Sequence, residues 1–342
     1  MRRIFTWVIL LALLVTAGLG YHVSRPLPLP AAPFEFALKQ GSSLKSAARQ
    51  LKQAGLLEQD VTFVWLARVQ GKSGMIKAGN YVLEHPVSRL ELLKIIAEGN
   101  VSQSQISVIE GWTFKQLRAA LDASPDVSHR TSGLSDAEIL QRIGATENHP
   151  EGLFFPDTYY FAAGSSDLTI YKVAYHTMQR RLQEAWAARE TDSPLKTPYQ
   201  ALILASIVEK ETGTPADRAM IAGVFVNRLS KGMLLQTDPT VIYGLGDKFD
   251  GNLRKRDLLA DTPYNTYTRR GLTPTPIALP GTAALQVALH PAQTDALYFV
   301  ARGDGSSQFS SNLIAHNRAV DKYQKRKSVL RDEAQGAAQL TR

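Results

Sequence analysis

The sequence contains no cysteine, which excludes disulfide bonds, thiol nucleophiles and thiolate metal sites. Its seven histidines are scattered, and no HExxH pattern places two of them on one helix face. A GxSxG nucleophile elbow and a phosphate-binding Walker loop are also missing. We therefore expect a protein that uses neither a metal ion nor another cofactor.

Long hydrophobic runs are missing from all but the N-terminus. Residues 4–21, IFTWVILLALLVTAGLGY, carry no charge and are close to the shortest length that spans a bilayer as a helix. Arg2 and Arg3 precede the run, so the positive-inside rule places the N-terminus in the cytoplasm and the rest outside. The run predicts a single membrane anchor. The alternative is a cleaved signal peptide, although no clear cleavage site is present.

The overall charge is basic, with a formal net charge of +8 and an isoelectric point of about 9.5. A basic protein can bind nucleic acid, anionic lipid or another acidic polymer. Export of the chain argues against nucleic acid, so we expect no nucleic-acid partner. The exported surface instead suits a polymer that bears carboxylates.

Composition and periodicity predict an α+β fold in which helices and short strands are mixed. Helices with capping boxes are expected at 88–97, after Thr113 and after Ser135, and a turn into a strand at 79–83. The predicted organisation is a cytoplasmic tip and transmembrane anchor (1–23), a Pro-rich linker (24–33), a compact α/β segment (34–104), a larger α+β domain opened by a strand near 105–109 (105–326) and a polar tail (327–342).

The segment from Thr197 to Gly213, TPYQALILASIVEKETG, predicts a helix that is apolar nearly all round and ends in two carboxylates. Thr197 and Gln200 suit a capping box. An acid near the C-terminal end of a buried helix meets the negative end of the helix dipole and an apolar surround, and both favour its protonated form. Such an acid suits general acid catalysis. The pattern does not choose between Glu209 and Glu211. Either one could instead be a helix-end charge paired with a neighbouring base.

A second group of candidates lies in and beside the irregular stretch 235–267, which is rich in tyrosine, amide and hydroxyl side chains. Tyrosine rings offer flat faces to sugars, and the amides and hydroxyls offer hydrogen bonds. Long loops of this kind often carry function. The alternative is that the loop uses these side chains in its own turns. The candidates for substrate binding are Glu211, Asn227, Gln236, Asp238, Tyr243, Tyr264, Asn265, Thr266 and Tyr267.

Three motifs together resemble one known family. They are ASIVEKET…VFVNRLSKGMLLQTDPTVIYG (205–244), PYNTY (263–267) and HPA (290–292). The sequence resembles the MltG (YceG-like) endolytic murein transglycosylases over nearly its whole length. The resemblance implies that residues 34–104 form a LysM-like subdomain and residues 105–326 the catalytic domain. It also implies that Glu209, the first acid of the IVEKET motif, is the catalytic residue.

The resemblance implies an enzyme that cleaves the β-1,4 bond between N-acetylmuramic acid and N-acetylglucosamine inside peptidoglycan glycan strands, terminating or trimming nascent strands. One glutamate would serve as acid and then as base, and the product would end in 1,6-anhydro-muramic acid. Glu211 would support the site or pair with Lys210 or Arg218. We expect a single-pass inner-membrane protein with a periplasmic catalytic domain. Penicillin-binding proteins and other cell-wall synthesis proteins are candidate partners.

Two alternatives remain open on the sequence. The first is a muramidase that hydrolyses the same bond with Asp238 as second carboxylate, because hydrolysis of a glycoside normally uses two carboxylates. The second is a non-catalytic adaptor that binds glycan through the LysM-like segment and docks a synthase.

Overall fold

The computed structural model describes residues 7, 14, 18, 20–29, 33–39, 41–98, 103–162, 164–190, 192–211 and 214–325. The chain forms two compact units, both of which contain helices and strands. The predicted α+β class is therefore confirmed. The first unit comprises Met1–Val108, Arg118–Gly144 and Asp157–Val173, and the second comprises Ile109–Leu117, Ala145–Pro156 and Ala174–Arg342.

Most of the predicted anchor and the whole of the predicted tail lie outside the described residues. Only 7, 14, 18 and 20–23 of the first 23 residues are described, and none of 327–342 is. Within the described part of the chain, no helix is both long enough and apolar enough to cross a bilayer.

The first unit is built on a four-stranded sheet in the order β1-β2-β4-β3. Strands β1 (Phe34–Leu38) and β2 (Gly79–Leu83) pair antiparallel, β2 and β4 (Thr158–Ala162) pair parallel, and β4 pairs antiparallel with β3 (Gln103–Ser107). The boundary predicted at residue 104 falls within β3, which belongs to this sheet. The prediction that this strand opens the larger domain is therefore corrected.

A stack of aromatic rings crosses three strands of this sheet. The rings of Phe36 and Tyr81 are stacked with centroids 5.0 Å apart, and those of Tyr81 and Tyr160 with centroids 5.1 Å apart. Gly79 makes room for this stack, because a Cβ atom there would lie 2.6 Å from the Tyr160 ring. Strand β4 was not predicted from the sequence.

Helices cover the sheet of the first unit, and the helix predicted at 88–97 is among them. They are α2 (Leu44–Gln53), α3 (Asp60–Val69) and α4 (Arg89–Glu98), and their inward faces join one hydrophobic core. The predicted Ser88–Glu91 capping box of α4 is present in both directions. Leu27, from the segment predicted to be a spacer, also lies in this core at 1% exposure. The chain near residue 27 therefore packs against the unit.

Three further helices follow β3. The first is α5 (Phe114–Asp122), the second is α6 (Asp136–Ile143) and the third is α7 (Asp167–Ala187). Both α5 and α7 have residues in each unit. The capping boxes predicted at Thr113 and Ser135 are confirmed.

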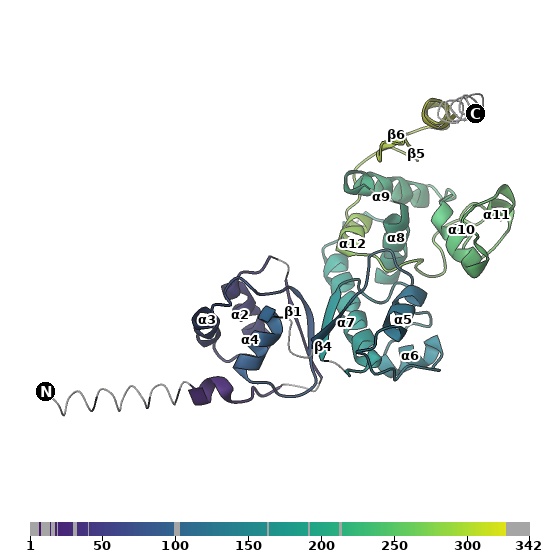
Figure 1. Ribbon diagram of the computed structural model, residues 1–342. Helices are drawn as coiled ribbons and strands as arrows, with labels where there is room; N and C mark the ends of the chain where they lie inside the picture. The colour runs from purple at the N-terminus through teal and green to yellow at the C-terminus, as the bar shows by residue number, and fades with distance from the viewer. Residues whose placement is uncertain are drawn as a thin grey trace, which may run out of the picture. The chain divides into compact units, whose positions relative to one another are not determined.

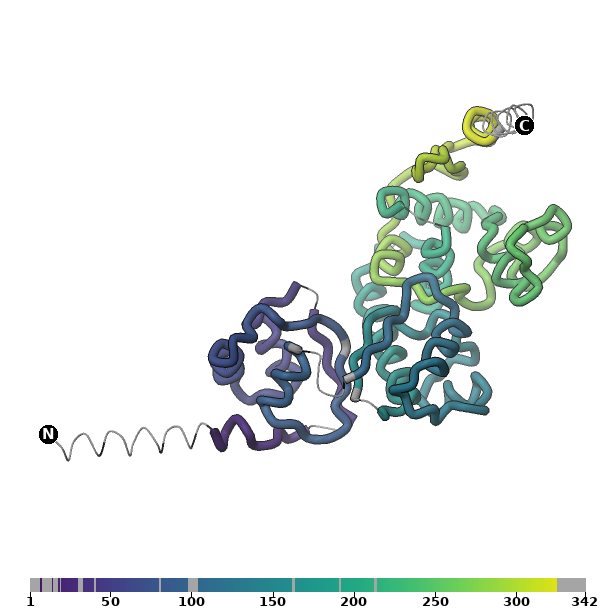
Figure 2. Tube along the Cα trace, viewed as in Figure 1, coloured from purple at the N-terminus to yellow at the C-terminus, as the bar shows by residue number. Residues whose placement is uncertain are grey.

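The second unit is mainly helical. Helices α8 (Pro198–Glu211), α9 (Pro215–Ser230) and α12 (Thr282–Leu289) pack against one another (Figure 1). The chain between α9 and α12, green in Figure 2, contains α10 (Asp238–Leu245), a 3-10 turn (Gly246–Lys248) and α11 (Lys255–Leu259), where the sequence had predicted irregular structure. A hairpin of β5 (Tyr298–Ala301) and β6 (Ser307–Ser310) precedes α13 (Leu313–Val320) and a π-helical turn (Asp321–Lys325).

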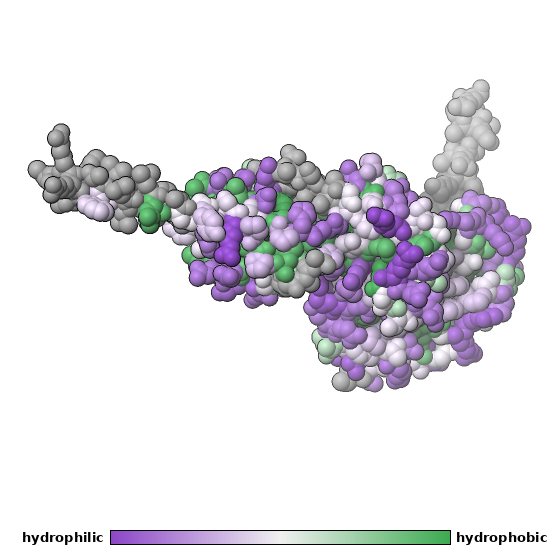
Figure 3. Space-filling view, turned by 90° about the horizontal axis from the view of Figure 1, so that it is seen from below, coloured by the Kyte–Doolittle hydropathy of each residue, from purple (hydrophilic) through white to green (hydrophobic). Residues whose placement is uncertain are grey.

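Helix α8 is buried on every side from Ala201 to Val208, as its apolar sequence predicted. Thr197 Oγ1 accepts a hydrogen bond from Gln200 N at 3.2 Å, as the predicted capping box requires. The return bond differs, because Gln200 Oε1 accepts from the backbone N–H of Lys196 and not from that of Thr197. Polar residues cover most of the surface seen in Figure 3, and hydrophobic residues appear there in scattered groups. Helix α8 thus combines a buried apolar length with a charged C-terminal end.

Candidate active site

The carboxyl group of Glu209 lies at the C-terminal end of α8 with only 7% of its side chain exposed. Its Oε2 atom accepts a hydrogen bond from the backbone N–H of Gly281 at 2.9 Å. Its Oε1 atom lies 3.8 Å from Nη2 of Arg218, on α9. The carboxyl group is thus fixed from two sides and faces one cation.

Two other chain segments hold the surroundings of this carboxyl group. Leu279 and the 111–112 segment exchange two backbone hydrogen bonds, Gly111 N to Leu279 O at 2.9 Å and Leu279 N to Trp112 O at 2.6 Å. Lys210 Nζ donates to the carbonyl oxygen of Gly111 at 3.2 Å. Residues 110–112 and 279–281 therefore lie together beside the end of α8.

Glu110 brings a second carboxyl group to this place, and the sequence analysis missed it. A Cβ atom built on Gly281 would lie 1.7 Å from Glu110 Oε1, so the Glu110 carboxyl group occupies the space over Gly281. Partial burial raises the pKa of Glu110, and the negative charge of Glu209 raises it further, whereas Arg218 lowers it. The site contains two interacting acids.

The small residues of α8 near Glu209 do not line an open space. Ala205 and Ser206 are fully buried. Ser206 Oγ donates to Ile203 O at 2.7 Å and accepts from the backbone N–H of Ile277 at 3.0 Å. The segment that leads to Gly281 covers this part of the helix.

Glu211 points to a different place from Glu209. It accepts a hydrogen bond from Thr237 Oγ1. Burial raises the pKa of Glu211, the nearby Asp238 raises it too, and the Thr237 hydrogen bond lowers it. The predicted pairing of Glu211 with Lys210 or Arg218 is wrong, because Arg218 faces Glu209 and Lys210 binds Gly111. Glu211 instead holds the start of α10.

The residues around Thr237 form one connected network. Thr266 is buried and its Oγ1 accepts a hydrogen bond from Thr237 N at 3.1 Å, so it holds the loop and is not placed to meet a sugar. Tyr267 donates its hydroxyl hydrogen to Asp238 Oδ1 at 2.5 Å. Gln236 is exposed and has a φ of 51°, the only positive φ among the described residues other than glycine. Strained backbone of this kind is often found at functional sites.

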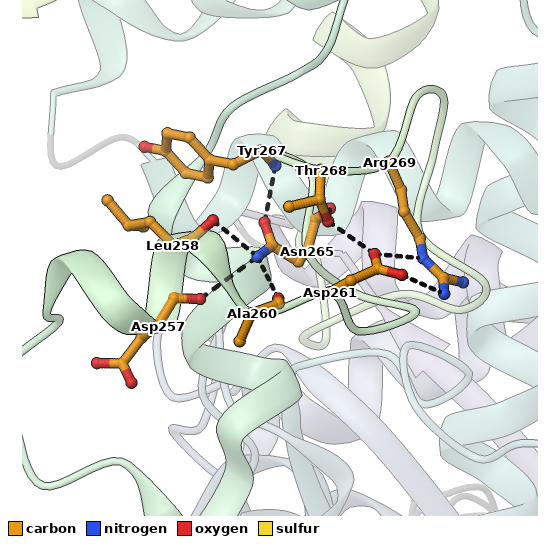
Figure 4. A network of polar contacts seen from close by, with 8 residues as sticks. All are labelled: Asp257, Leu258, Ala260, Asp261, Asn265, Tyr267, Thr268 and Arg269. Atoms are coloured by element: carbon orange, nitrogen blue, oxygen red, sulfur yellow. Dashed lines mark hydrogen bonds and ion pairs between the residues drawn. The ribbon is translucent and has the colours of Figure 1, made fainter.

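Asn265 supports the loop from inside (Figure 4). Its side chain is fully buried, and Nδ2 donates to the carbonyl oxygens of Asp257, Leu258 and Ala260 at 3.3, 3.0 and 2.7 Å. Its Oδ1 accepts from Tyr267 N at 2.8 Å. Every polar atom of this side chain is therefore engaged within the protein, and we correct its predicted role from sugar contact to loop support.

The remaining candidates for substrate binding are Asn227, Tyr243 and Tyr264. Asn227 Nδ2 donates to the carbonyl oxygens of Thr294 and Ala296, so this residue also acts within the fold. The rings of Tyr243 and Tyr264 meet edge to face with centroids 5.0 Å apart. Tyr243 donates to Glu151 Oε2 at 3.1 Å.

Glu151 is a second carboxylate that the sequence analysis missed. It is only 3% exposed, and its Oε1 accepts from the backbone N–H of Phe114 at the start of α5.

No group of three or more potential metal-ligating side chains occurs among the residues that the structure describes.

The chain is similar to proteins of one known family. The model of the YceG-like family matches residues 36–322. An endolytic murein transglycosylase of Bacillus subtilis (strain 168) is 33% identical over 303 residues, which are 84% of this chain and 83% of that protein. An endolytic murein transglycosylase of Streptococcus pneumoniae (serotype 2, strain D39) is 27% identical over 357 residues; the match covers 93% of this chain and 64% of that longer protein.

A solved structure agrees as well. A crystal structure of a yceG-like protein from Listeria monocytogenes superposes with a TM-score of 0.52 at 28% identity, covering 83% of this chain and 98% of that one. The match of the family model to most of the chain, together with these relatives, shows that the chain belongs to the YceG-like family.

Proposed function

We propose that this protein is an endolytic murein transglycosylase in which Glu209 is the catalytic residue. The observation that carries the proposal is the fixed carboxyl group of Glu209, at the end of a buried helix between Gly281 N–H and Arg218. The named relatives are endolytic murein transglycosylases, and their matches cover 84% and 93% of this chain.

The reaction needs one carboxyl group that first gives and then takes a proton. Protonated Glu209 donates its proton to the glycosidic oxygen between N-acetylmuramic acid and N-acetylglucosamine, and the bond from that oxygen to C1 breaks. The carboxylate then removes the proton of the muramoyl C6 hydroxyl, whose oxygen bonds to C1. The Gly281 N–H orients the carboxyl group, and Arg218 stabilises its charged form between the two steps.

Hydrolysis is the second candidate, and one observation favours it. We expected a single dominant glutamate, but Glu110 stands beside Glu209. Two neighbouring carboxyl groups are also what glycosidases use to activate water. Asp238, the second carboxylate we had considered, bonds to Tyr267 and contributes to the raised pKa of Glu211.

The substrate of the proposed reaction is the glycan strand of peptidoglycan. Of the predicted substrate-binding residues, Gln236 and Asp238 are exposed, and the ring of Tyr264 is half-exposed. We further propose that residues 4–21 anchor the chain in the inner membrane, with the catalytic domain in the periplasm. The basis is their uncharged sequence after two arginines. Cell-wall synthesis proteins are proposed partners on the basis of the sequence resemblance alone.

Product analysis decides between the candidates. Purified peptidoglycan sacculi are digested with the full-length protein, and the released glycan is analysed by mass spectrometry. Muramic acid ends that lack one water relative to the hydrolysed product identify the transglycosylase. Reducing muramic acid ends identify a hydrolase, and undigested strands in the presence of bound protein support the non-catalytic adaptor.

A further inference from the structure

The least expected feature of the site is a pair of carboxyl groups that both lie against Gly281. Glu209 comes from the end of α8, and Glu110 comes from the segment that follows β3. Gly281 separates them: its backbone N–H binds Glu209 Oε2 at 2.9 Å, and the space where a side chain would begin is filled by the Glu110 carboxyl group. A glycine here therefore allows the two acids to approach one backbone position.

Among the residues that the structure describes, the cations near this pair include Arg218 and Lys210. Arg218 Nη2 lies 3.8 Å from Glu209 Oε1 and lowers the pKa of Glu110. Lys210 Nζ is held at the carbonyl oxygen of Gly111. The third segment, 276–284, contains no ionisable side chain. Two neighbouring carboxyl groups retain a proton more readily than either acid alone, because their negative charges repel each other.

We propose that Glu110 is a positioning residue that shares one proton with Glu209, so that the pair enters the reaction singly protonated. This inference rests on the proposed transglycosylase function. In the first step the proton leaves Glu209 for the departing glycosidic oxygen, and both carboxyl groups become charged. Their repulsion then makes Glu209 a stronger base for the C6 hydroxyl proton. Ring closure returns one proton to the pair, so the proton count is unchanged over a cycle.

The closest test is the pH profile of kcat/KM for release of anhydro ends. When Glu110 is ionised, its charge keeps the proton on Glu209 to a higher pH. In Glu110→Gln this charge is gone while the shape is kept, so the alkaline limb of the profile should move to lower pH by about 1 unit or more. Glu110→Asp keeps the charge and should retain most of the wild-type limb. Glu184→Gln, an exposed glutamate of α7, is the matched control and should leave the limb in place.

The outcomes distinguish a failure of the proposed function from a failure of proton sharing. If wild-type protein releases no anhydro ends, the proposed function fails before the pair is tested. If wild type releases them but the alkaline limb of Glu110→Gln coincides with that of wild type, proton sharing is overturned whether or not the overall rate falls. A purely structural role of Glu110 would lower the rate at all pH values without moving the limb.

A second measurement follows the titration of the pair directly, without an activity assay. In wild-type protein with ¹³C-labelled glutamate, NMR of the side-chain carboxyl carbons should show two coupled titrations from this pair, one of them above the ordinary glutamate value of about 4.3. The upper titration should disappear in Glu209→Gln and in Glu110→Gln. Two independent titrations near the ordinary value would contradict the proposal.

Discussion

Glu209 and Gly281, 72 residues apart in sequence, are joined by a hydrogen bond from the glycine N–H to carboxyl oxygen Oε2. The bond fixes the acid at the end of α8 against the start of α12, and Gly281 is also the position over which Glu110 lies. One glycine therefore sets the geometry of both carboxyl groups.

Gly281→Ala should separate the two acids without unfolding the protein. The φ of Gly281 is −82°, which alanine adopts readily, and the three atoms nearest its new Cβ all belong to the flexible side chain of Glu110. We expect a loss of at most about 1 kcal/mol of stability, since alanine caps a helix less well than glycine. The alkaline limb of the activity profile should move as in Glu110→Gln.

The control for this substitution is Gly74→Ala, where the new Cβ would meet nothing within 4 Å. Thermal melting and the pH profile of kcat/KM are measured on both variants. A Gly281→Ala protein with the wild-type limb, and with glycan ends released at the wild-type rate, would show that the approach of Glu110 to this position has no role in the reaction.

Glu211→Gln should make the protein more stable relative to wild type as the pH rises. Burial raises the pKa of Glu211 in the folded state, so its favourable contribution is complete below the unfolded value of about 4.3 and is lost as the pH rises through the folded pKa. Glutamine does not titrate. The difference in unfolding free energy between variant and wild type should therefore grow over this window, as followed by urea denaturation.

The stability difference between Asp261→Asn and wild type should change with pH in the opposite direction. The hydrogen bond from Arg269 is the largest cause that lowers the pKa of Asp261, to about 2, so its contribution is present above the unfolded value and is lost as the pH falls. A difference curve for Glu211→Gln that slopes in the same direction as that of Asp261→Asn would contradict the assignment of Glu211 as a buried acid.

Asn265→Ala should destabilise the loop that carries α11. Removing the amide leaves three carbonyl oxygens without their shared donor, and a lost buried partner costs about 1–3 kcal/mol. Hydrogen exchange should show faster opening of residues 255–268. Asn252→Ala, at an exposed position, should change stability by less than about 0.5 kcal/mol. Equal effects of the two substitutions would exclude the supporting role.

Much of the helical structure was predictable because its signals are local. The capping boxes at Ser88, Thr113 and Ser135 and the apolar run of α8 lie within a few residues of the helices they define. Strand β4 was missed because its aromatic residues read equally well as a turn, and only pairing with β2 and β3 makes them a strand. Helices α10 and α11 were missed because they are short and follow turn-forming residues.

The site was predictable only in part. Helix spacing could not separate Glu209 from Glu211, and the family resemblance chose Glu209. Glu110 and Glu151 were missed because contacts between distant segments bring them to their places. A sequence signal existed for Glu110, which is followed directly by Gly111, a residue type that suits a turn. Asn265 looked like a sugar contact because sequence does not reveal that a polar side chain is buried.

The central claim is that Glu209 carries out the proton transfers, and the direct measurement is digestion of sacculi by Glu209→Gln with mass analysis of the products. The variant keeps a side chain that can accept the Gly281 hydrogen bond, so it should fold and bind glycan while releasing no anhydro ends above background. Glu184→Gln should release them at the wild-type rate. Anhydro ends produced by folded Glu209→Gln at a rate close to that of wild type would contradict the account.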